Sequence, residues 1–385
     1  MSADDVLINA LNEAKILTVS RVKKEIIDNV DVLINYIDTN KSLVSALTTS
    51  LVKKILEPNQ DIRLHRVDFE NGYSARSLDT NFITPFFKEH FPRYANKETA
   101  FLTLATREKI PWKLKEGNAL KIRNIELKIA FLQILHNIQV RNQSPWQYLV
   151  YIFHRLFELS QKEHKILLAS LKDIKKVADL NINTVIAMLK KHFSTKHSSR
   201  LPVLAIYSVY QELVKSVNRY SDKNLLKLNV HTSLDKHSFG DIEIYNKDRQ
   251  PFEVIEIKHN ISIDRYLIFD IIKKIENQPI SKYYILTTHP NNFESEDEEN
   301  YINDLVLSIK KEYGFEIIVN GIINSLKYYL RFIDNYHRFV ENYTNNLIKD
   351  FKYSTEVKPE HISVWKEIIS QHFSSEDLVF TPPSF

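Results

Sequence analysis

Three charged side chains occur in a segment that otherwise has the pattern of buried strands. Asp241 directly follows one of only five glycines in the chain, and Glu256 and Lys258 lie two residues apart in the apolar run FEVIEIKH. Charged groups are costly to bury unless they are paired or bind a metal ion, so this pattern calls for a functional explanation. Because side chains alternate along a strand, Glu256 and Lys258 share one face. If the two strands are neighbours, all three side chains converge at one edge of the sheet.

The chemistry that fits such a group is metal-assisted hydrolysis. Two adjacent carboxylates repel each other unless a cation lies between them, and oxygen ligands without a histidine or thiolate cluster favour Mg²⁺. A neighbouring lysine can orient or help to deprotonate a water molecule, while the metal ion polarises a phosphoryl oxygen. The alternative is an edge strand with solvated charges on its open face. The flanking strands and helix favour the metal site.

Composition limits the class of protein. The chain has 385 residues, which predicts two or three structural units. Hydrophobic residues make up 43% of it, which indicates a globular protein, and the absence of cysteine excludes disulfides and thiolate chemistry. The N-terminus lacks a signal-peptide pattern, and no apolar run reaches the roughly 18 residues of a membrane span. We therefore expect a soluble intracellular protein, whose net charge of +4 permits nucleic-acid binding.

Four segments of different character follow one another. Residues 1–57 are expected to form a helical unit, because their apolar spacing suits amphipathic helices. Residues 58–200 begin with a loop region rich in arginine and aromatic residues, with short strands up to about Pro85, and continue as helices. One of these helices is predicted to start at Ser144 and Pro145. Residues 201–350 form the main α/β core, and residues 351–385 form a C-terminal extension.

The core has the predicted order α-β-β-β-α-β, with a further helix, strand and helix appended. The fold class is therefore α/β (α+β), with a mixed β-sheet flanked by helices. The strands are expected at 226–233, 240–246, 252–259, 282–289 and 315–321, and the helices at 204–220, 263–277, 301–313 and 323–347.

The residues Gly240-Asp241 and Glu256-Ile257-Lys258, in this order of elements, resemble the PD-(D/E)xK phosphodiesterase superfamily and, within it, the type II restriction endonucleases. The resemblance covers about residues 203 to 290, and Gly240 replaces the usual proline. It implies a restriction-endonuclease-like core in which Asp241, Glu256 and the carbonyl of Ile257 bind Mg²⁺. It also implies that Lys258 is the base that positions water.

Further site residues follow from the resemblance and from the neighbouring sequence. Some members of the superfamily add an acid from the preceding helix, and Glu212 is the candidate here, although a solvent-facing helix glutamate is an equal reading. His231, Asp235 and His237 lie just before the site in the sequence and could contact water or DNA. A histidine in a polar turn is more often structural than catalytic.

DNA contacts are expected from two basic segments. In residues 61–85, Arg63, Arg66 and Arg76 carry forked donors suited to guanine or phosphate, and Tyr73 adds a polar tip. The alternative for Arg76 is an ion pair with Asp79.

The second basic segment, KKHFSTKHSSR, contains Lys190, Lys191 and Arg200, which are expected to contact phosphates unless the segment is simply a solvated loop. The aromatic stripe LKYYLRFIDNYHRF has helical spacing and is assigned to a dimer contact.

Together these patterns predict a Mg²⁺-dependent, sequence-specific endonuclease of double-stranded DNA. It would act as a homodimer on a symmetric site, in the cytoplasm of a prokaryote, without a membrane partner and with a separate cognate DNA methyltransferase. One alternative is a nuclease of the same fold that selects DNA structure or modified bases, in repair, mobile-element or phage-defence roles. Another is a DNA-binding module that no longer catalyses.

Overall fold

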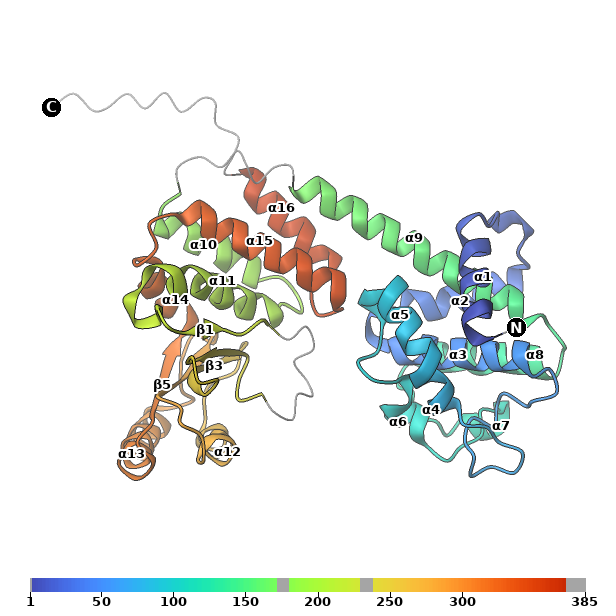
Figure 1. Cartoon of the computed structure of the whole chain (residues 1–385), viewed down its shortest axis with the longest axis horizontal. Helices are drawn as coiled ribbons and strands as arrows, with labels where there is room; N and C mark the ends of the chain where they lie inside the picture. The colour runs from blue at the N-terminus through green and yellow to red at the C-terminus, as the bar shows by residue number, and fades with distance from the viewer. Residues whose placement is uncertain (1, 172–179, 229–237, 372–385) are drawn as a thin grey trace, which may run out of the picture. The chain divides into compact units, whose positions relative to one another are not determined.

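The chain folds into two compact units, which are labelled by their elements in Figure 1. The computed structural model describes residues 2–171, 180–228 and 238–371. The first unit ends at Lys165 and also includes Lys352–Thr355, and the second unit holds the other described residues. The first unit has a single hydrophobic core, to which residues on both sides of residue 57 contribute. The helices up to residue 171 are α1 (Ala3–Lys15), α2 (Lys24–Asn35), α3 (Ile37–Leu56), α4 (Ala75–Leu78), α5 (Thr84–His90), α6 (Leu104–Arg107), α7 (Leu114–Gly117), α8 (Ile125–Gln139) and α9 (Pro145–Leu171).

Helix α3 forms the centre of the first unit. Every residue from Leu43 to Val52 is buried, so this helix is covered on all sides. Several of these residues are serine or threonine, and their hydroxyl groups need partners in the core. Thr48 and Thr49 each donate to a main-chain carbonyl one turn earlier in the helix.

A buried carboxylate, Asp79, connects α3 to the segments that surround it. Its Oδ1 accepts hydrogen bonds from the hydroxyls of Ser45 (2.9 Å) and Thr49 (3.2 Å). Its Oδ2 accepts from the hydroxyls of Thr84 (3.0 Å) and Thr99 (2.5 Å) and from the main-chain N–H of Ala100 (2.8 Å). Neutral donors from three parts of the chain therefore satisfy this carboxylate.

The prediction of short strands between residues 58 and 85 is wrong. Residues 58–117 are all described and contain no strand, and α4, a π-helical turn (Asp79–Ile83) and α5 follow one another directly. The apolar residues that suggested strands are buried at helical spacing, as in Ile83, Phe86 and Phe87. The helix start predicted at Ser144 and Pro145 is confirmed, because α9 begins at Pro145.

The second unit contains a mixed sheet of five strands in the order β1-β2-β3-β4-β5. The strands β1, β2 and β3 are antiparallel, whereas β3, β4 and β5 are parallel. The bounds are β1 (Asn224–Leu225), β2 (Ile242–Tyr245), β3 (Pro251–Lys258), β4 (Lys282–Thr287) and β5 (Glu316–Gly321). The helices are α10 (Ile182–Phe193), α11 (Arg200–Ser216), α12 (Arg265–Ile275), α13 (Glu296–Tyr313), α14 (Ile322–Leu330), α15 (Tyr336–Tyr353) and α16 (Pro359–Gln371).

Helices cover both faces of this sheet. Figure 1 shows α12 and α13 on one side, and α10, α11, α14, α15 and α16 on the other. Two separate apolar clusters fill the layers: Ile255 and Ile257 of β3 belong to one, and Val254 belongs to the other. The strand β3 therefore buries both faces except where Glu256 and Lys258 replace apolar residues.

The predicted α/β class, with a mixed sheet flanked by helices, is confirmed in this unit. The first strand differs from the prediction, because β1 ends at Leu225, residues 226–228 are not in a strand, and the rest of the predicted segment lies outside the described residues. The single helix predicted at 323–347 is two helices, α14 and α15. Asn335 interrupts it by accepting the N–H of Arg338 and so starting a second helix. Among the described residues, no helix has the length and apolar character needed to cross a membrane.

We expect Asp79→Ala to lower the free energy of unfolding by about 3 kcal/mol, because it leaves several buried hydroxyls and one main-chain N–H without an acceptor. Urea unfolding followed by circular dichroism measures this change. Asp28→Ala, an exposed carboxylate on α2, is the matched control and should change the stability by less than about 0.5 kcal/mol. Equal effects of the two substitutions would contradict the role given to Asp79.

Candidate functional site

The strands β2 and β3 separate at Asp241, and this is where the charged residues meet. The main-chain N–H of Asp241 donates to the carbonyl of Ile255 (2.9 Å), and β2 begins at the next residue. Beyond this point the carboxylate of Asp241 takes the place of a neighbouring strand, because its Oδ2 accepts the main-chain N–H of Ile257 (2.8 Å). The N–H and C=O of one strand residue point to the same side, so the carbonyl of Ile257 also points toward this gap.

Glu256 and Lys258 lie on the same face of β3 and form an ion pair. The Nζ of Lys258 donates to Oε1 of Glu256 at 2.7 Å, and the two side chains are only 25% and 19% exposed. The prediction that Glu256 and Lys258 share one face of the strand is confirmed. The other carboxylate oxygen of Glu256 lies 3.5 Å from the hydroxyl of Tyr283, on β4.

The electrostatics indicate that Asp241 and Glu256 are close enough to interact strongly. Burial, together with the negative charge of Glu256, raises the pKa of Asp241 from its ordinary value to about 6. The hydrogen bond from the N–H of Ile257 and the charges of Lys258 and Arg200 act in the opposite direction and do not cancel this rise in the pKa. A pair of acids whose charges oppose each other in a partly buried site is a common arrangement for binding a cation.

The turn before Asp241 is held by Glu243, a residue for which the sequence predicted no role beyond its place in the strand. One carboxylate oxygen of Glu243 accepts from the hydroxyl of Ser238 (2.8 Å) and from the N–H groups of Phe239 (2.6 Å) and Gly240 (3.3 Å). The other oxygen accepts from the hydroxyl of Tyr245 (2.9 Å). The buried glutamate in the run GDIEIY was a signal of this role, because a buried carboxylate needs several donors.

Gly240 lies directly against β3, which explains why no proline precedes Asp241. A Cβ atom at this position would lie 2.5 Å from Cγ1 of Val254 and 2.9 Å from the carbonyl oxygen of Ile255. Either distance is shorter than a Cβ atom tolerates, so any residue larger than glycine would move the turn.

The end of the second basic segment lies next to the end of β3. The hydroxyl of Ser198 is 3.1 Å from Nε2 of His259, the residue that follows Lys258. The Nδ1 of His259 is 2.9 Å from the hydroxyl of Thr288, which follows β4. The segment preceding α11 is thus connected to the sheet beside the candidate site.

Two residues that the sequence assigned to the site or to DNA have other partners. Glu212 accepts hydrogen bonds from Lys215 (2.8 Å) and from Asn342 on α15 (2.7 Å), so the structure does not bring it into contact with the acids of β2 and β3. Arg200 is buried and donates from Nε and Nη2 to Asp350 at 2.9 and 3.1 Å. The prediction that Arg200 contacts phosphates is wrong, because its guanidinium group lies inside the second unit.

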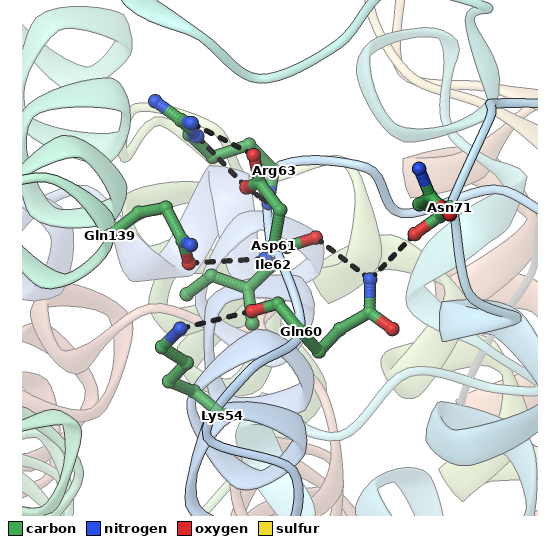
Figure 2. Close-up of polar contacts among 7 residues, drawn as sticks. All are labelled: Lys54, Gln60, Asp61, Ile62, Arg63, Asn71 and Gln139. Carbon is green, nitrogen blue, oxygen red and sulfur yellow. Dashed lines mark hydrogen bonds and ion pairs between the residues drawn. The ribbon is translucent and has the colours of Figure 1, made fainter.

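The predicted DNA-contacting segment of the first unit is bonded both within itself and to neighbouring residues, as Figure 2 shows. Arg63 donates from Nε and Nη2 to the carboxylate of Asp61 at 2.9 and 2.8 Å. The amide of Gln60 donates to the carbonyl of Asn71 (2.8 Å), which joins the two ends of the loop. The guanidinium group of Arg63 therefore stabilises the loop, and it must leave Asp61 before it can contact a ligand.

The other three predicted contacts in this segment differ in their accessibility. Arg66 donates to Asp68 (2.8 Å) and to the carbonyl of Arg107 (2.5 Å). Tyr73 is buried, with its hydroxyl 3.2 Å from that of Ser50, so the prediction that Tyr73 contacts DNA is wrong. Arg76 is exposed on α4, and the alternative pairing with Asp79 does not occur, because other donors occupy both oxygens of that carboxylate.

Lys190 and Lys191 are exposed at the end of α10, and Lys191 donates to the side-chain oxygen of Gln371 (2.9 Å). The predicted contacts at His231, Asp235 and His237 lie outside the described residues.

The side chains available for a metal ion are two carboxylates. Among residues 2–171, 180–228 and 238–371, no group of three histidine, cysteine, aspartate or glutamate side chains is arranged to hold a metal ion. Asp241 is bonded to the main chain of Ile257 and interacts electrostatically with Glu256, so the oxygens to consider are those of the two carboxylates and of the Ile257 carbonyl. This set fits Mg²⁺, which typically keeps several water ligands and takes one or two carboxylates from the protein.

No protein-family model and no curated protein matches this sequence.

The raised pKa of Asp241 leads to a prediction for stability. Above about pH 6 the folded protein must ionise a buried carboxyl group, whereas the unfolded chain ionises it near its ordinary pKa, so this group lowers stability as the pH rises. In metal-free buffer, we expect the free energy of unfolding of Asp241→Asn, relative to wild type, to rise by about 1 kcal/mol between about pH 5 and about pH 7.5. Urea unfolding at the two pH values measures it. The exposed Asp270→Asn on α12 should show no such trend, and a flat difference for Asp241→Asn would refute the assigned cause.

Proposed function

We propose that this protein is a Mg²⁺-dependent endonuclease of double-stranded DNA, with a restriction-endonuclease-like core in its second unit. The observation that carries the proposal is the arrangement at the gap between β2 and β3. Asp241 accepts the main-chain N–H of Ile257. Ile257 lies between Glu256 and Lys258, which form an ion pair. Three side chains of the types needed for phosphodiester hydrolysis therefore lie around one point at the end of two adjacent strands.

In this proposal, Asp241, Glu256 and the carbonyl of Ile257 hold the metal ion. A bound Mg²⁺ ion would polarise the phosphoryl oxygen and offset the negative charge that grows during the reaction. Lys258 positions the water: its ammonium group stays near the site through its bond to Glu256 and can orient the attacking water. Partial burial of both side chains strengthens these interactions, because water screens them less than at an exposed surface.

DNA binding is assigned to the exposed basic residues of the two predicted segments. Arg76 in the first unit and Lys190 and Lys191 in the second remain candidates, because all three are exposed. Arg63 and Arg66 would have to leave their present carboxylate partners before they could contact a base or a phosphate. Cleavage of both strands at a symmetric site is simplest for a homodimer, and a sequence-specific enzyme of this kind implies a separate methyltransferase that protects the host site.

The test of the proposed activity is digestion of an unmodified plasmid of known sequence with Mg²⁺, followed by sequencing of the fragment ends. We expect discrete fragments from the wild type, and at least about a 100-fold lower cleavage rate for Lys258→Ala. Asp241→Ala should lose Mg²⁺-dependent cleavage to a similar degree. Lys273→Ala, an exposed lysine on α12, is the matched control and should cut like the wild type.

Absence of cleavage by a folded wild type across unmodified and modified plasmids would reject the proposed activity. A smear, or cleavage only of modified DNA, would instead identify a nuclease with the other selectivity.

The DNA-contact assignment has its own test. We expect Arg76→Ala and Lys190→Ala each to weaken binding to a short duplex and to reduce the slope of log affinity against log salt concentration by about 1, as loss of one phosphate contact does. Fluorescence anisotropy at several salt concentrations measures both quantities. Lys24→Ala, at the start of α2 and outside both basic segments, is the control. Unchanged slopes for both test variants would show that these residues do not contact phosphates.

A further inference from the structure

The main-chain bonds of the sheet place Asp241 against β3 but do not fix the side chain of Glu256. Glu256 lies within β3, whereas Asp241 lies just before β2 and is preceded by the turn from Ser238 to Gly240. Asp241 is bonded to β3 on either side of Glu256, at the carbonyl of Ile255 and at the N–H of Ile257. A metal site needs its ligands at a fixed spacing, so the Glu256 carboxylate must also be held relative to the turn that carries Asp241.

The side chain of Tyr283 makes this connection. Its hydroxyl donates to the carbonyl of Phe239 at 2.8 Å and lies 3.5 Å from Oε2 of Glu256. One buried hydroxyl from β4 therefore contacts both the turn that leads to Asp241 and the acid on β3.

The position of Tyr283 is fixed by the sheet. In the parallel register of β3 and β4, Tyr283 is the partner of Val254, and its ring belongs to the apolar cluster on that face. The residue is fully buried, so its hydroxyl cannot exchange its protein partners for water.

Glu243 holds the same turn from the other side. It accepts the N–H of Phe239, whereas Tyr283 donates to the carbonyl of Phe239. Both polar groups of one peptide residue are thus bound by buried side chains from two different strands. These two bonds fix the turn just before Asp241.

We infer that Tyr283 is a positioning residue for the proposed metal site, and that its hydroxyl sets the spacing between Asp241 and Glu256. This inference rests on the proposed function. Removing the hydroxyl while keeping the ring should make the spacing between Asp241 and Glu256 less fixed, and the ring still fills its place in the apolar cluster. Loss of a group that orients metal ligands typically weakens metal binding by about 10- to 100-fold.

The test compares Tyr283→Phe with Tyr284→Phe in the full-length protein. Tyr284 is the next residue of β4 and packs against the apolar cluster on the opposite face of the sheet, so it controls for loss of a tyrosine hydroxyl from this strand. Isothermal titration with Mg²⁺ and cleavage rates across a range of Mg²⁺ concentrations are the readouts. We expect Tyr283→Phe to raise the Mg²⁺ dissociation constant by about 10-fold or more, with much of the cleavage rate recovered at saturating Mg²⁺. Tyr284→Phe should match the wild type in both.

Glu243→Gln is the second variant, which keeps the inference testable if Tyr283→Phe does not fold. It replaces one acceptor oxygen with a donor and should also raise the Mg²⁺ dissociation constant. Wild-type affinity in a folded Tyr283→Phe, or in Glu243→Gln where the first variant is unfolded, would overturn the positioning role. Failure of the proposed function gives a different result. In that case the wild type either binds no Mg²⁺ or binds it as well as Asp241→Asn does.

Discussion

The constraint on which this structure depends is a single main-chain donor, the N–H of Ile257. Ile257 lies where β3 continues beyond the start of β2, so this buried group loses the partner that a sheet would supply, and a buried donor without an acceptor is costly. Asp241 supplies the acceptor with its own carboxylate. The same hydrogen bond that completes β3 thus attaches one acid to the strand that carries Glu256 and Lys258. The position of the Asp241 carboxylate thus follows from the need of the Ile257 N–H for a hydrogen-bond acceptor.

Two aspartates with limited exposure, Asp79 and Asp241, are in opposite circumstances. Asp79 accepts five hydrogen bonds, four from hydroxyls and one from a main-chain N–H, so neutral dipoles disperse its charge. Asp241 has one such bond and faces a second carboxylate, which raises its pKa to about 6. The first arrangement stabilises a fold. The second leaves charge that a cation could neutralise, and this difference supports a functional role for Asp241.

Sequence patterns predicted the order of elements around the sheet, because alternation in IEIY and FEVIEIK and helical spacing around them are local properties. The pairing of Lys258 with Glu256 also follows from alternation alone. The partners of arginines were harder to predict: Arg200 pairs with an aspartate 150 positions away, whereas the Arg63–Asp61 pair was within reach of local inspection. Tyr283 could not be found from the sequence, because its contacts depend on the register between parallel strands.

Gly240 carries a consequence for how this site could vary among proteins with the same architecture. The space that a side chain would occupy there is filled by Cγ1 of Val254 and the main chain of β3. A chain with proline before the aspartate would need a smaller residue in place of Val254 and a wider separation of the two strands at that point. These two positions should therefore covary, with glycine accompanying a branched residue and proline a smaller one. Sequence motifs that require proline before the acid would pass over the glycine-containing form.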